Sequence, residues 1–275
     1  MYPRPTAFPW VLYSIMEGLY TGTSGWIYKG WAGSFYPPRL NGPDKFAFYA
    51  TQFGTVEINN TFYRLPTEKA VRNWDAQAPV GFLYAVKGSR FITQMKKLNV
   101  DEKSLFLMLD RIDPLKKHLG PILWQLPPNF GINLERLERF LKMLPRRYKY
   151  AMEFRHPSWM DPRVFKLLER YNIAHASVSS LRMPMNLTVT GDFAYLRFHG
   201  LEGGAAHDYR SEELKPWAEH CSEALRHGMK VFAYFNNDIN TRAPENAKMF
   251  ISMVESGSRR KFKPRVSSVI AGNAF

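Results

Sequence analysis

Residues 193–199, Phe193-Ala194-Tyr195-Leu196-Arg197-Phe198-His199, begin as an apolar run and end in a guanidinium and an imidazole. A buried strand has no structural reason to finish in such groups, because an unpaired charge away from water is costly. In a (β/α)8 barrel, however, the strand tips and the loops that follow them form the active face. The stretch therefore predicts one strand of such a barrel, with its polar end at the barrel mouth.

Seven other short apolar runs recur along the chain, and most of them also end in polar residues. Helical stretches separate most of them, and this alternation favours parallel β/α winding over a sandwich. Eight strands predict an α/β fold with a single (β/α)8 TIM-like barrel. An open doubly wound sheet is the alternative, and the absence of GxGxxG and GxxxxGK[ST] loops weakens it. The predicted strands cover residues 19–24, 55–61, 82–88, 121–126, 149–155, 174–179, 193–199 and 230–236, and the predicted helices cover residues 44–53, 68–78, 102–119, 134–144, 162–171, 211–227 and 244–254.

The barrel domain is predicted to span residues 19–256, between a short N-terminal extension (1–18) and a basic C-terminal tail (257–275). The sixth crossover, residues 180–191, contains Pro184 and has no helical period, so it is predicted to be an irregular loop. The tail holds a cationic cluster without an acid, which predicts a loosely held extension. The cationic residues of the tail are Arg259, Arg260, Lys261, Lys263 and Arg265.

The chain has 275 residues, of which 45% are hydrophobic, and its formal net charge is +14. Such an excess of positive charge favours anionic partners, because counterion release adds affinity for nucleic acid. The alternative is a soluble protein whose charge is spread evenly. The expected partner is DNA or another nucleic acid, and a phosphorylated small molecule is the second choice.

Cysteine usage and hydrophobicity indicate the compartment. The single Cys221 excludes an internal disulfide and indicates a reducing environment. The first 16 residues lack the basic and apolar regions of a signal peptide, and no apolar run approaches the roughly 18 residues of a membrane span. A cytoplasmic location without a membrane partner is therefore expected.

The polar strand ends contain residues two positions apart, which face the same side of a strand. We expect these pairs to point into the barrel mouth, with Lys87 and Gln125 in similar positions on their own strands. A structural ion network, in which cations neutralise Glu57 and Glu153, is the alternative explanation. A purely structural barrel, however, fills its layers with Val, Ile and Leu and does not concentrate polarity at one end. The pairs are Glu57 with Asn59, Glu153 with Arg155, Arg197 with His199, and Tyr234 with Asn236.

Two carboxylates at one mouth favour general acid–base or glycosidic chemistry. Metal binding is the other option, but neither HExxH nor paired-cysteine spacing occurs, and the interleaved cations would repel a metal ion. No metal site and no cofactor are therefore expected, and a catalytic divalent metal is the less favoured alternative. The side chains considered as ligands are Glu57, Glu153, His156, His175, His199, His207, Asp208 and Asp238, of which His175 is equally well explained as a hydrogen-bonded core residue.

Two loops bring aromatic side chains close to the strand ends. Trp26 and Tyr28 follow the first predicted strand, and Trp159 follows the fifth. Aromatic faces beside basic groups can stack on bases or sugars. For each ring the alternative is hydrophobic packing that caps the barrel.

Several ordered motifs carry a resemblance to a known family: Gly22-Thr23-Ser24-Gly25-Trp26 with Tyr28, Trp31 and Phe35-Tyr36-Pro37; Val56-Glu57-Ile58-Asn59 with Thr61-Phe62-Tyr63; Gln125-Leu126-Pro127-Pro128; Glu153-Phe154-Arg155-His156 with Ser158-Trp159; Tyr195-Leu196-Arg197 with His199-Gly200; and Tyr234-Phe235-Asn236-Asn237-Asp238. In these motifs, over roughly residues 20–254, the chain resembles the family called domain of unknown function 72, or YecE-like. The resemblance implies a TIM-like barrel distantly similar to the endonuclease IV and xylose isomerase superfamily, but no secure activity.

The chain departs from the family pattern at the sixth strand. Members often carry an aspartate at its end, where this chain reads Ala176-Ser177-Val178-Ser179-Ser180, so no role can rest on that carboxylate here. Endonuclease IV-like enzymes use a zinc cluster of many His, Asp and Glu ligands. This sequence supplies too few such groups at its strand ends to reproduce that cluster.

The sequence thus predicts a nucleic-acid-processing enzyme that hydrolyses a phosphodiester or N-glycosidic bond in DNA or a nucleotide-like anion. The alternatives are a sugar or sugar-phosphate isomerase or lyase, and a non-catalytic nucleic-acid-binding protein. In the favoured hypothesis a glutamate activates water, an imidazole transfers a proton, and the cations hold phosphate. The predicted catalytic residues are Glu57, Glu153, His156, His199 and Lys87, and the predicted substrate-binding residues are Asn59, Gln125, Arg155, Arg197, Tyr234, Asn236, Asn237, Trp26, Tyr28 and Trp159.

Overall fold

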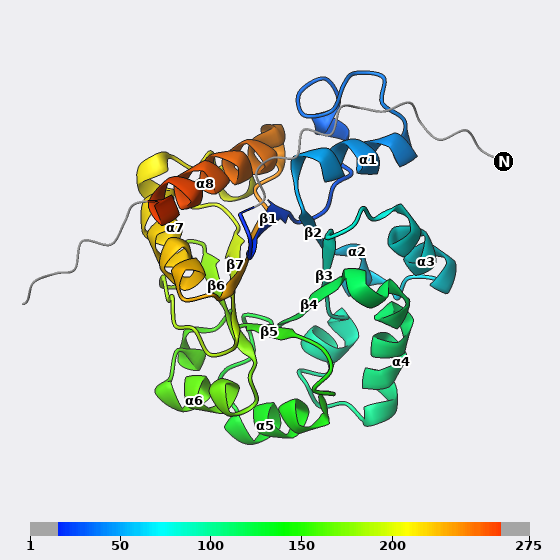
Figure 1. Cartoon of the computed structure of the whole chain (residues 1–275). Helices are drawn as coiled ribbons and strands as arrows, with labels where there is room; N and C mark the ends of the chain where they lie inside the picture. Colours follow the sequence, from blue (N-terminus) through cyan, green and yellow to red (C-terminus); the bar gives the residue numbers. More distant parts are fainter. Residues whose placement is uncertain (1–15, 260–275) are drawn as a thin grey trace, which may run out of the picture.

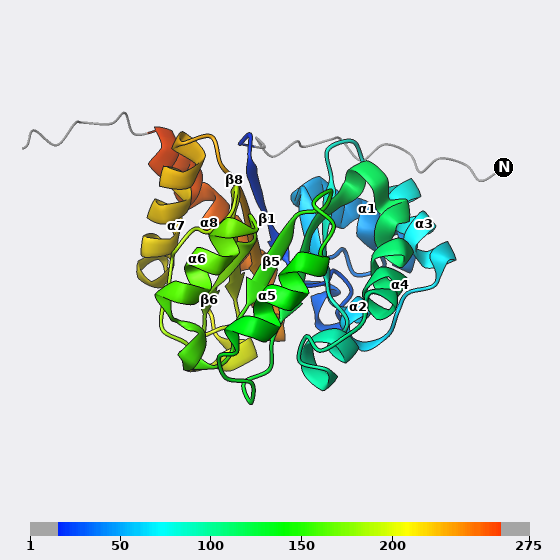
Figure 2. The same cartoon turned by 90° about the horizontal axis from the view of Figure 1, so that it is seen from below.

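Within residues 16–259, the part of the chain that the structure describes, eight parallel strands curl into a barrel that helices surround (Figure 1, Figure 2). The structure is a computed structural model. From β2 to β8 each strand pairs with its neighbours in the chain, and β1 pairs with β8. The predicted α/β fold with a (β/α)8 TIM-like barrel is confirmed. The strands are β1 (Leu19–Thr23), β2 (Thr55–Ile58), β3 (Leu83–Lys87), β4 (Leu119–Gln125), β5 (Tyr150–Glu153), β6 (Ala174–Ser179), β7 (Phe193–Phe198) and β8 (Lys230–Phe235).

The helices between the strands begin at the capping residues that the sequence offers. At the start of one helix the Asn133 side chain accepts a hydrogen bond from the Arg136 backbone N–H. At the start of another, the Asp161 side chain accepts one from the Arg163 backbone N–H, and Pro162 is the first helical residue. The α-helices are α1 (Gly42–Gln52), α2 (Asn60–Tyr63), α3 (Glu68–Gln77), α4 (Glu102–Ile112), α5 (Leu134–Met143), α6 (Pro162–Arg170), α7 (Ser211–Arg226) and α8 (Arg242–Arg259), and short turns of other helix types are η1 (Lys29–Trp31), η2 (Phe91–Met95), η3 (Asp113–His118), η4 (Pro157–Trp159), η5 (Gly204–Ala206) and η6 (Ile239–Thr241).

Several element boundaries differ from the sequence prediction, and two of the differences have a clear physical reason. β2 ends at Ile58 rather than at residue 61, because α2 begins immediately afterwards. The helix predicted over residues 102–119 ends at Ile112, and the chain continues as η3 through Pro114, whose missing N–H cannot extend an α-helix. The predicted loop between β6 and β7 is confirmed, since no helix forms there.

The terminal predictions are covered only in part. Helix α8 continues to Arg259, beyond the predicted end of the helix at residue 254. Residues 1–15 of the predicted N-terminal extension and residues 260–275 of the predicted basic tail lie outside the described residues.

The barrel interior below the mouth, toward the amino ends of the strands, is apolar. Large side chains fill it from one wall and small ones from the other. Aromatic rings from β7 and β8 pack against alanines from β3, β5 and β6, so the wide side chains of one wall fill the space that the narrow ones leave. The interior residues are Ala85, Leu123, Ala151, Ala174, Ala176, Phe193, Tyr195, Phe232 and Tyr234. Since residues two apart face the same side, the next inward positions along these strands lie at the carboxyl end.

β1 and β2 close the barrel with very little backbone pairing. A single bridge joins Ser24 to Glu57, and the Gly25 backbone N–H donates to the Glu57 carbonyl oxygen at 2.8 Å. Gly22 allows the two strands to approach, because a Cβ at this position would lie 2.2 Å from the Thr55 carbonyl oxygen. Any other residue would push the two strands apart.

The Tyr49 hydroxyl fills the gap in this seam. It accepts a hydrogen bond from the Thr23 backbone N–H at 2.9 Å and donates one to the Thr55 carbonyl oxygen at 3.1 Å. Replacing Tyr49 by phenylalanine should lower the free energy of unfolding by about 1–3 kcal/mol, because both buried backbone groups lose a partner. Urea unfolding measures the change, and Tyr63→Phe is the control because Tyr63 is 66% exposed. Equal stability of the two variants would show that the hydroxyl does not support the seam.

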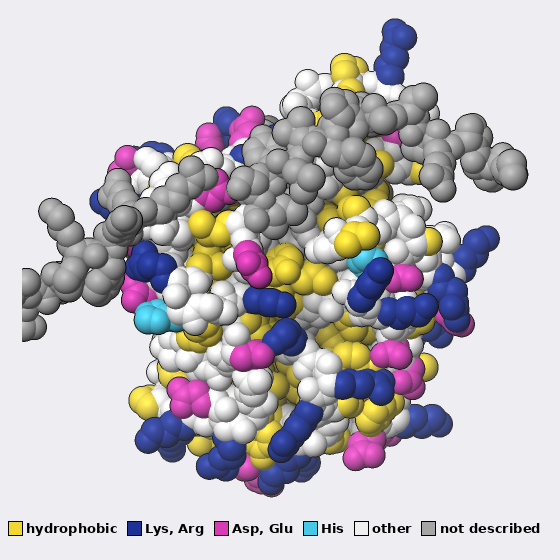
Figure 3. Space-filling model, viewed as in Figure 1, with side chains coloured by type: hydrophobic (Ala, Val, Ile, Leu, Met, Phe, Trp, Pro, Cys, Tyr) yellow, Lys and Arg dark blue, Asp and Glu magenta, His cyan; other side chains and the backbone are white. Residues whose placement is uncertain are grey.

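The mouth of the barrel points toward the lower edge of Figure 2, where the strands end. Figure 3 shows the opposite end, on which Lys and Arg side chains are spread among Asp and Glu. The positive charge is therefore not gathered into one patch on the visible part of this face. None of the helices within residues 16–259 is long and apolar enough to cross a membrane.

Candidate active site

Six strands place a half-buried polar side chain at the barrel mouth. Each of these residues lies two positions beyond a fully buried inward-facing residue of the same strand, so alternation directs it into the mouth. Three are amides, two are cations and one is an imidazole, and none is a carboxylate. We call them the upper ring: Asn59, Lys87, Gln125, Arg155, His199 and Asn236.

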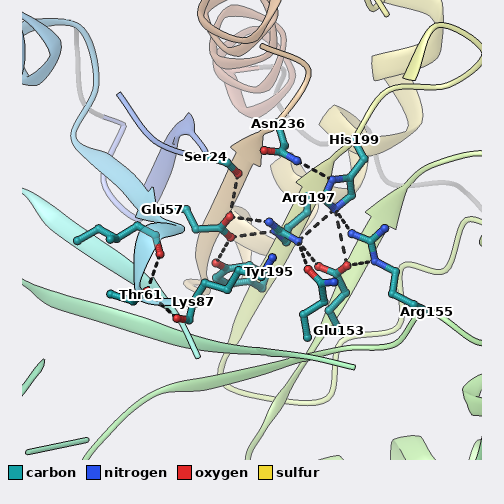
Figure 4. Close-up of polar contacts among 12 residues, drawn as sticks. Ser24, Glu57, Thr61, Lys87, Glu153, Arg155, Tyr195, Arg197, His199 and Asn236 are labelled. Atoms are coloured by element: carbon teal, nitrogen blue, oxygen red, sulfur yellow. Dashed lines mark hydrogen bonds and ion pairs between the residues drawn. The ribbon is translucent and has the colours of Figure 1, made fainter. Parts of the chain in front are cut away.

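A buried ion network lies directly beneath the upper ring and consists of Glu57, Glu153 and Arg197 (Figure 4). Arg197 is 1% exposed, and its Nε and Nη2 donate to the two carboxylate oxygens of Glu57 at 2.9 and 2.7 Å. Its Nη1 donates to Oε2 of Glu153 at 2.5 Å. One guanidinium from β7 therefore joins carboxylates from β2 and β5 across the barrel.

Glu57 has its carboxylate oxygens fully occupied. Besides the two bonds from Arg197, it accepts hydrogen bonds from the Ser24 hydroxyl at 2.8 Å and the Tyr195 hydroxyl at 2.7 Å. Burial alone would raise its pKa, but the charge and hydrogen bonds of Arg197 outweigh burial and hold the pKa below its usual value. Glu57 is therefore an ionised, fully bonded group.

Glu153 is also ionised. Burial opposes its charge, but Arg155 and Arg197 hold its pKa well below the usual value. The Arg155 Nε donates to Oε1 of Glu153, and the Arg155 side chain is 20% exposed. Arg155 therefore links the buried ion network to the open mouth.

His199 is a neutral imidazole within this group. Its Nε2 lies 2.7 Å from Nη2 of Arg155 and 3.2 Å from Nη1 of Arg197, both of which can only donate. Burial, followed by the charge of Arg197, lowers the pKa of His199 to about 4. Nδ1 on the other side of the ring lies 3.1 Å from the side-chain nitrogen of Asn236, which can donate to it.

Lys87 differs from the two arginines of the site. Its ammonium forms no hydrogen bond or ion pair with the described residues and lies 4.2 Å from the centre of the Phe62 ring. The Thr61 hydroxyl donates to the Lys87 carbonyl oxygen at 2.7 Å, which fixes the backbone at the end of β3. Burial and then the positive charge of Arg197 lower the pKa of Lys87 to about 8. Lys87 therefore supplies an amine that is partly unprotonated near neutral pH.

Besides the buried Glu57, Glu153 and Arg197, three further predicted site residues have no surface for contact with a substrate. Trp159 is 0% exposed, and its indole N–H donates to the Phe130 carbonyl oxygen, so it packs as part of the core. Tyr234 is also fully buried, and its hydroxyl lies 2.8 Å from the Thr55 hydroxyl inside the barrel. The fully buried Asn237 donates to the His207 carbonyl oxygen and so holds the loop after β7. The predicted substrate contacts do not fit these positions.

The other predicted residues lie nearer the mouth but outside the hydrogen-bonded group. His156 bonds to Ser158 within its own loop. Trp26 and Tyr28 are half-buried, and Tyr28 bonds through its hydroxyl to the Ser24 carbonyl oxygen. Asn59 has a buried side-chain oxygen without a hydrogen-bond partner among the described residues.

His175, considered as a metal ligand, faces away from the mouth. It lies on β6 between the rings of Phe154 and Phe165, and burial lowers its pKa to about 4. Across residues 16–259, no group of three or more His, Cys, Asp or Glu side chains is arranged to hold a metal ion.

Sequence reasoning did not include four residues that support the site. Tyr195 lies two positions before Arg197, so the same alternation that selected Arg197 also indicates Tyr195. Ser24 directly follows β1, and it was not selected because its side chain carries no charge. Thr61 and Phe62 belong to α2, and a strand prediction that extends to residue 61 conceals their position beside Lys87.

The comparisons with known proteins agree on one family. The family described as "Protein of unknown function DUF72" matches residues 20–268. The UPF0759 protein YunF of Bacillus subtilis is 26% identical over 275 residues, which cover 86% of this chain and 95% of that protein. The UPF0759 protein YecE of Escherichia coli is 32% identical over 142 residues, about half of each chain.

Solved structures support the same fold. A DUF72 family protein of Thermotoga maritima has a TM-score of 0.79 and 28% identity, and the match covers 86% of this chain and 99% of that one. A DUF72 family protein of Enterococcus faecalis has a TM-score of 0.75 at 18% identity, with 86% and 95% of the two chains covered.

Proposed function

The chain belongs to the DUF72 family of proteins of unknown function, and we propose that it is an enzyme that breaks a phosphodiester or N-glycosidic bond in nucleic acid or a nucleotide-like anion. The observation that carries this proposal is the composition of the upper ring. Its charged members, Lys87 and Arg155, are both cations. Glu57 and Glu153 lie beneath it and balance the charges of Arg197 and Arg155, so Lys87 is left as the excess positive charge of the group. A ligand that enters the mouth therefore meets positive charge and amide groups, which suits phosphate.

The roles that we propose for the glutamates and for Lys87 differ from those of the sequence hypothesis. A general base works best when its pKa lies near the working pH, and the pKa values of Glu57 and Glu153 are lowered instead. We assign these glutamates to holding Arg197 in place. Lys87, with its pKa lowered to about 8, takes the reactive role at the mouth.

The charge of the whole chain supports an anionic polymer as substrate. The formal net charge of +14 would draw nucleic acid toward the protein at low ionic strength and weaken that attraction as salt is added. Cys221 is a buried free thiol, in agreement with the cytoplasmic location that we propose.

A screen of labelled oligonucleotides tests this function. Intact, abasic, uracil-containing and hypoxanthine-containing strands are incubated with the full chain, with and without a chelator. We expect cleavage of at least one substrate, reduced about 100-fold or more by Lys87→Met, because the amine is the group that reacts. Lys117→Met is the matched control, since Lys117 is exposed in η3 at the opposite end of the barrel.

The screen can also contradict the proposal. Lack of cleavage of every strand would remove nucleic acid as the substrate class. Cleavage that survives Lys87→Met unchanged would remove Lys87 from its role. Strong chelator sensitivity would overturn the expectation that no metal takes part.

A second candidate is a non-catalytic nucleic-acid-binding protein. The observation that favours it is the complete bonding of Glu57 and Arg197, which suits a structural ion network as well as an active site. In that case DNA binding would fall steeply with salt, and no strand of the screen would be cleaved.

A further inference from the structure

We propose that Lys87 forms a covalent imine with a substrate whose aldehyde or ketone lies close to a phosphate group. This inference deepens the proposed function, because it names the chemistry of the same mouth. It rests on the position of one amine relative to the ion network and does not depend on nucleic acid as the source of the carbonyl.

An imine-forming lysine needs an accessible lone pair, and no residue within 16–259 forms an ion pair with the Lys87 ammonium. The nearest carboxylates are occupied: Glu57 is bonded by Ser24, Tyr195 and Arg197. Glu153 is bonded by Arg155 and Arg197. A lysine that served only to neutralise these acids would be bonded to one of them. Lys87 instead lies against the Phe62 ring, and in Figure 4 its side chain extends from β3 toward Arg197.

The surroundings of Lys87 favour the neutral amine. Its side chain is largely buried, and Arg155 and Arg197 add positive charge nearby, so loss of the ammonium proton relieves repulsion. A protonated lysine has no lone pair and cannot attack a carbonyl. The pKa of about 8 therefore leaves a useful fraction of reactive amine near neutral pH.

The same cations indicate a phosphate beside the carbonyl. Arg155 is the partly exposed guanidinium of the upper ring. Its Nε is bonded to Glu153 and its Nη2 lies 2.7 Å from His199, so its Nη1 is the nitrogen that can donate to a phosphate oxygen. A phosphate bound there would place the adjacent carbon atoms of the same molecule over the mouth.

The chemical step balances without an external oxidant or reductant. The Lys87 lone pair forms a bond to the carbonyl carbon, and the π electrons of the carbonyl move to its oxygen, which takes a proton. Loss of that oxygen as water then leaves a C=N bond to Lys87. The protonated imine withdraws electrons, so the neighbouring carbon loses a proton to a water molecule and a phosphate oxygen one carbon further leaves with its bonding pair. Addition of water to the remaining C=N bond then releases the product aldehyde and returns the Lys87 amine. A phosphodiester bond is thereby broken by elimination.

Reductive trapping tests the inference. The full chain is incubated with sodium cyanoborohydride and either an oligonucleotide that contains one abasic site or glycolaldehyde phosphate. The hydride reduces the imine to a stable secondary amine, and mass spectrometry of the digested protein locates the added mass. We expect the label on Lys87 to exceed that on any other lysine at least tenfold, and an excess of inorganic phosphate to reduce it at least tenfold.

The variants make the assignment specific. Lys87→Met should abolish the label at this peptide, and Lys117→Met should leave the labelling of Lys87 unchanged. Because labelling is mapped on the wild-type protein, the test does not depend on the folding of the Lys87 variant.

The outcomes separate this inference from the proposed function. Trapping of the abasic strand supports both, and trapping of glycolaldehyde phosphate alone supports the imine and overturns nucleic acid as its source. Oligonucleotide cleavage without any trapped Lys87 leaves the proposed function standing and overturns the imine. Label spread evenly over the lysines, or not reduced by phosphate, also overturns it.

Discussion

Arg197→Leu should lower the free energy of unfolding by about 3–5 kcal/mol, because it leaves two buried carboxylates without their shared cation. Arg197 is 1% exposed and binds both Glu57 and Glu153, each of which is 0% exposed. Urea unfolding at pH 7 measures the loss. Arg163→Leu is the control, since Arg163 pairs with Asp161 at 68% exposure and such surface pairs contribute about 1 kcal/mol or less.

The pH dependence of this loss has a definite sign. In the wild-type chain the pKa values of Glu57 and Glu153 are lowered, so their contribution to stability is present above about pH 4.5 and is lost as the pH falls. Without Arg197 the two carboxyls take up protons more readily. The deficit of the Arg197→Leu variant should therefore be smaller at pH 5 than at pH 7.

A triple variant checks the physical cause. Glu57→Leu, Glu153→Leu and Arg197→Leu together remove every charge of the buried ion network, and most of the stability should return. If the triple variant is as unstable as Arg197→Leu alone, the loss comes from the shape of the side chain and not from unpaired charge.

Lys87→Met should change activity and stability in opposite directions. Activity on any substrate found in the oligonucleotide screen should fall about 100-fold or more, because the reacting amine is removed. The free energy of unfolding should rise at pH 7 by up to about 3 kcal/mol, since the wild-type chain keeps an ammonium whose pKa is lowered from 10.5 to about 8. If Lys87 only stabilised the fold, the substitution would lower both the activity and the free energy of unfolding.

The sign of the pH effect follows from the lowered pKa of Lys87. Between about pH 8 and pH 10.5 the unfolded chain holds a proton on this lysine that the folded chain has released. The free energy of unfolding of the wild-type chain therefore increases with pH in this range. The excess stability of Lys87→Met over the wild-type chain should be fully present below pH 8 and should vanish above about pH 10.5. An advantage that persists unchanged at pH 10.5 would have to come from packing of the methionine.

The strand pattern was sufficient to predict the barrel and much of its mouth. Runs such as residues 193–199 alternate inward and outward, and their polar ends could be placed at one end of the barrel from spacing alone. The contacts of Arg197 with Glu57 and Glu153 show that these distant residues do meet. Which side chains lie deep and which lie at the rim could not be predicted, because strand tilt and register depend on the whole barrel.

The aromatic residues show a second limit of the sequence. Trp159 beside a polar strand end has the composition of a stacking platform, yet its indole ring packs against Phe154 and Phe130 and is fully buried. Loop residues carry no periodicity that distinguishes a ring facing the core from one facing solvent. The same limit conceals α2, a single turn whose Phe62 ring supports Lys87.

The protonation of Lys87 tests the central claim that the mouth holds a free amine among neutralised carboxylates. Carbon-13 NMR of the lysine ε-methylene groups follows each lysine through a pH titration, and Lys87→Met assigns the signal. We predict a midpoint near pH 8 for Lys87. A midpoint close to 10.5, the ordinary value for lysine, would show that the amine is solvated or paired and would contradict the account.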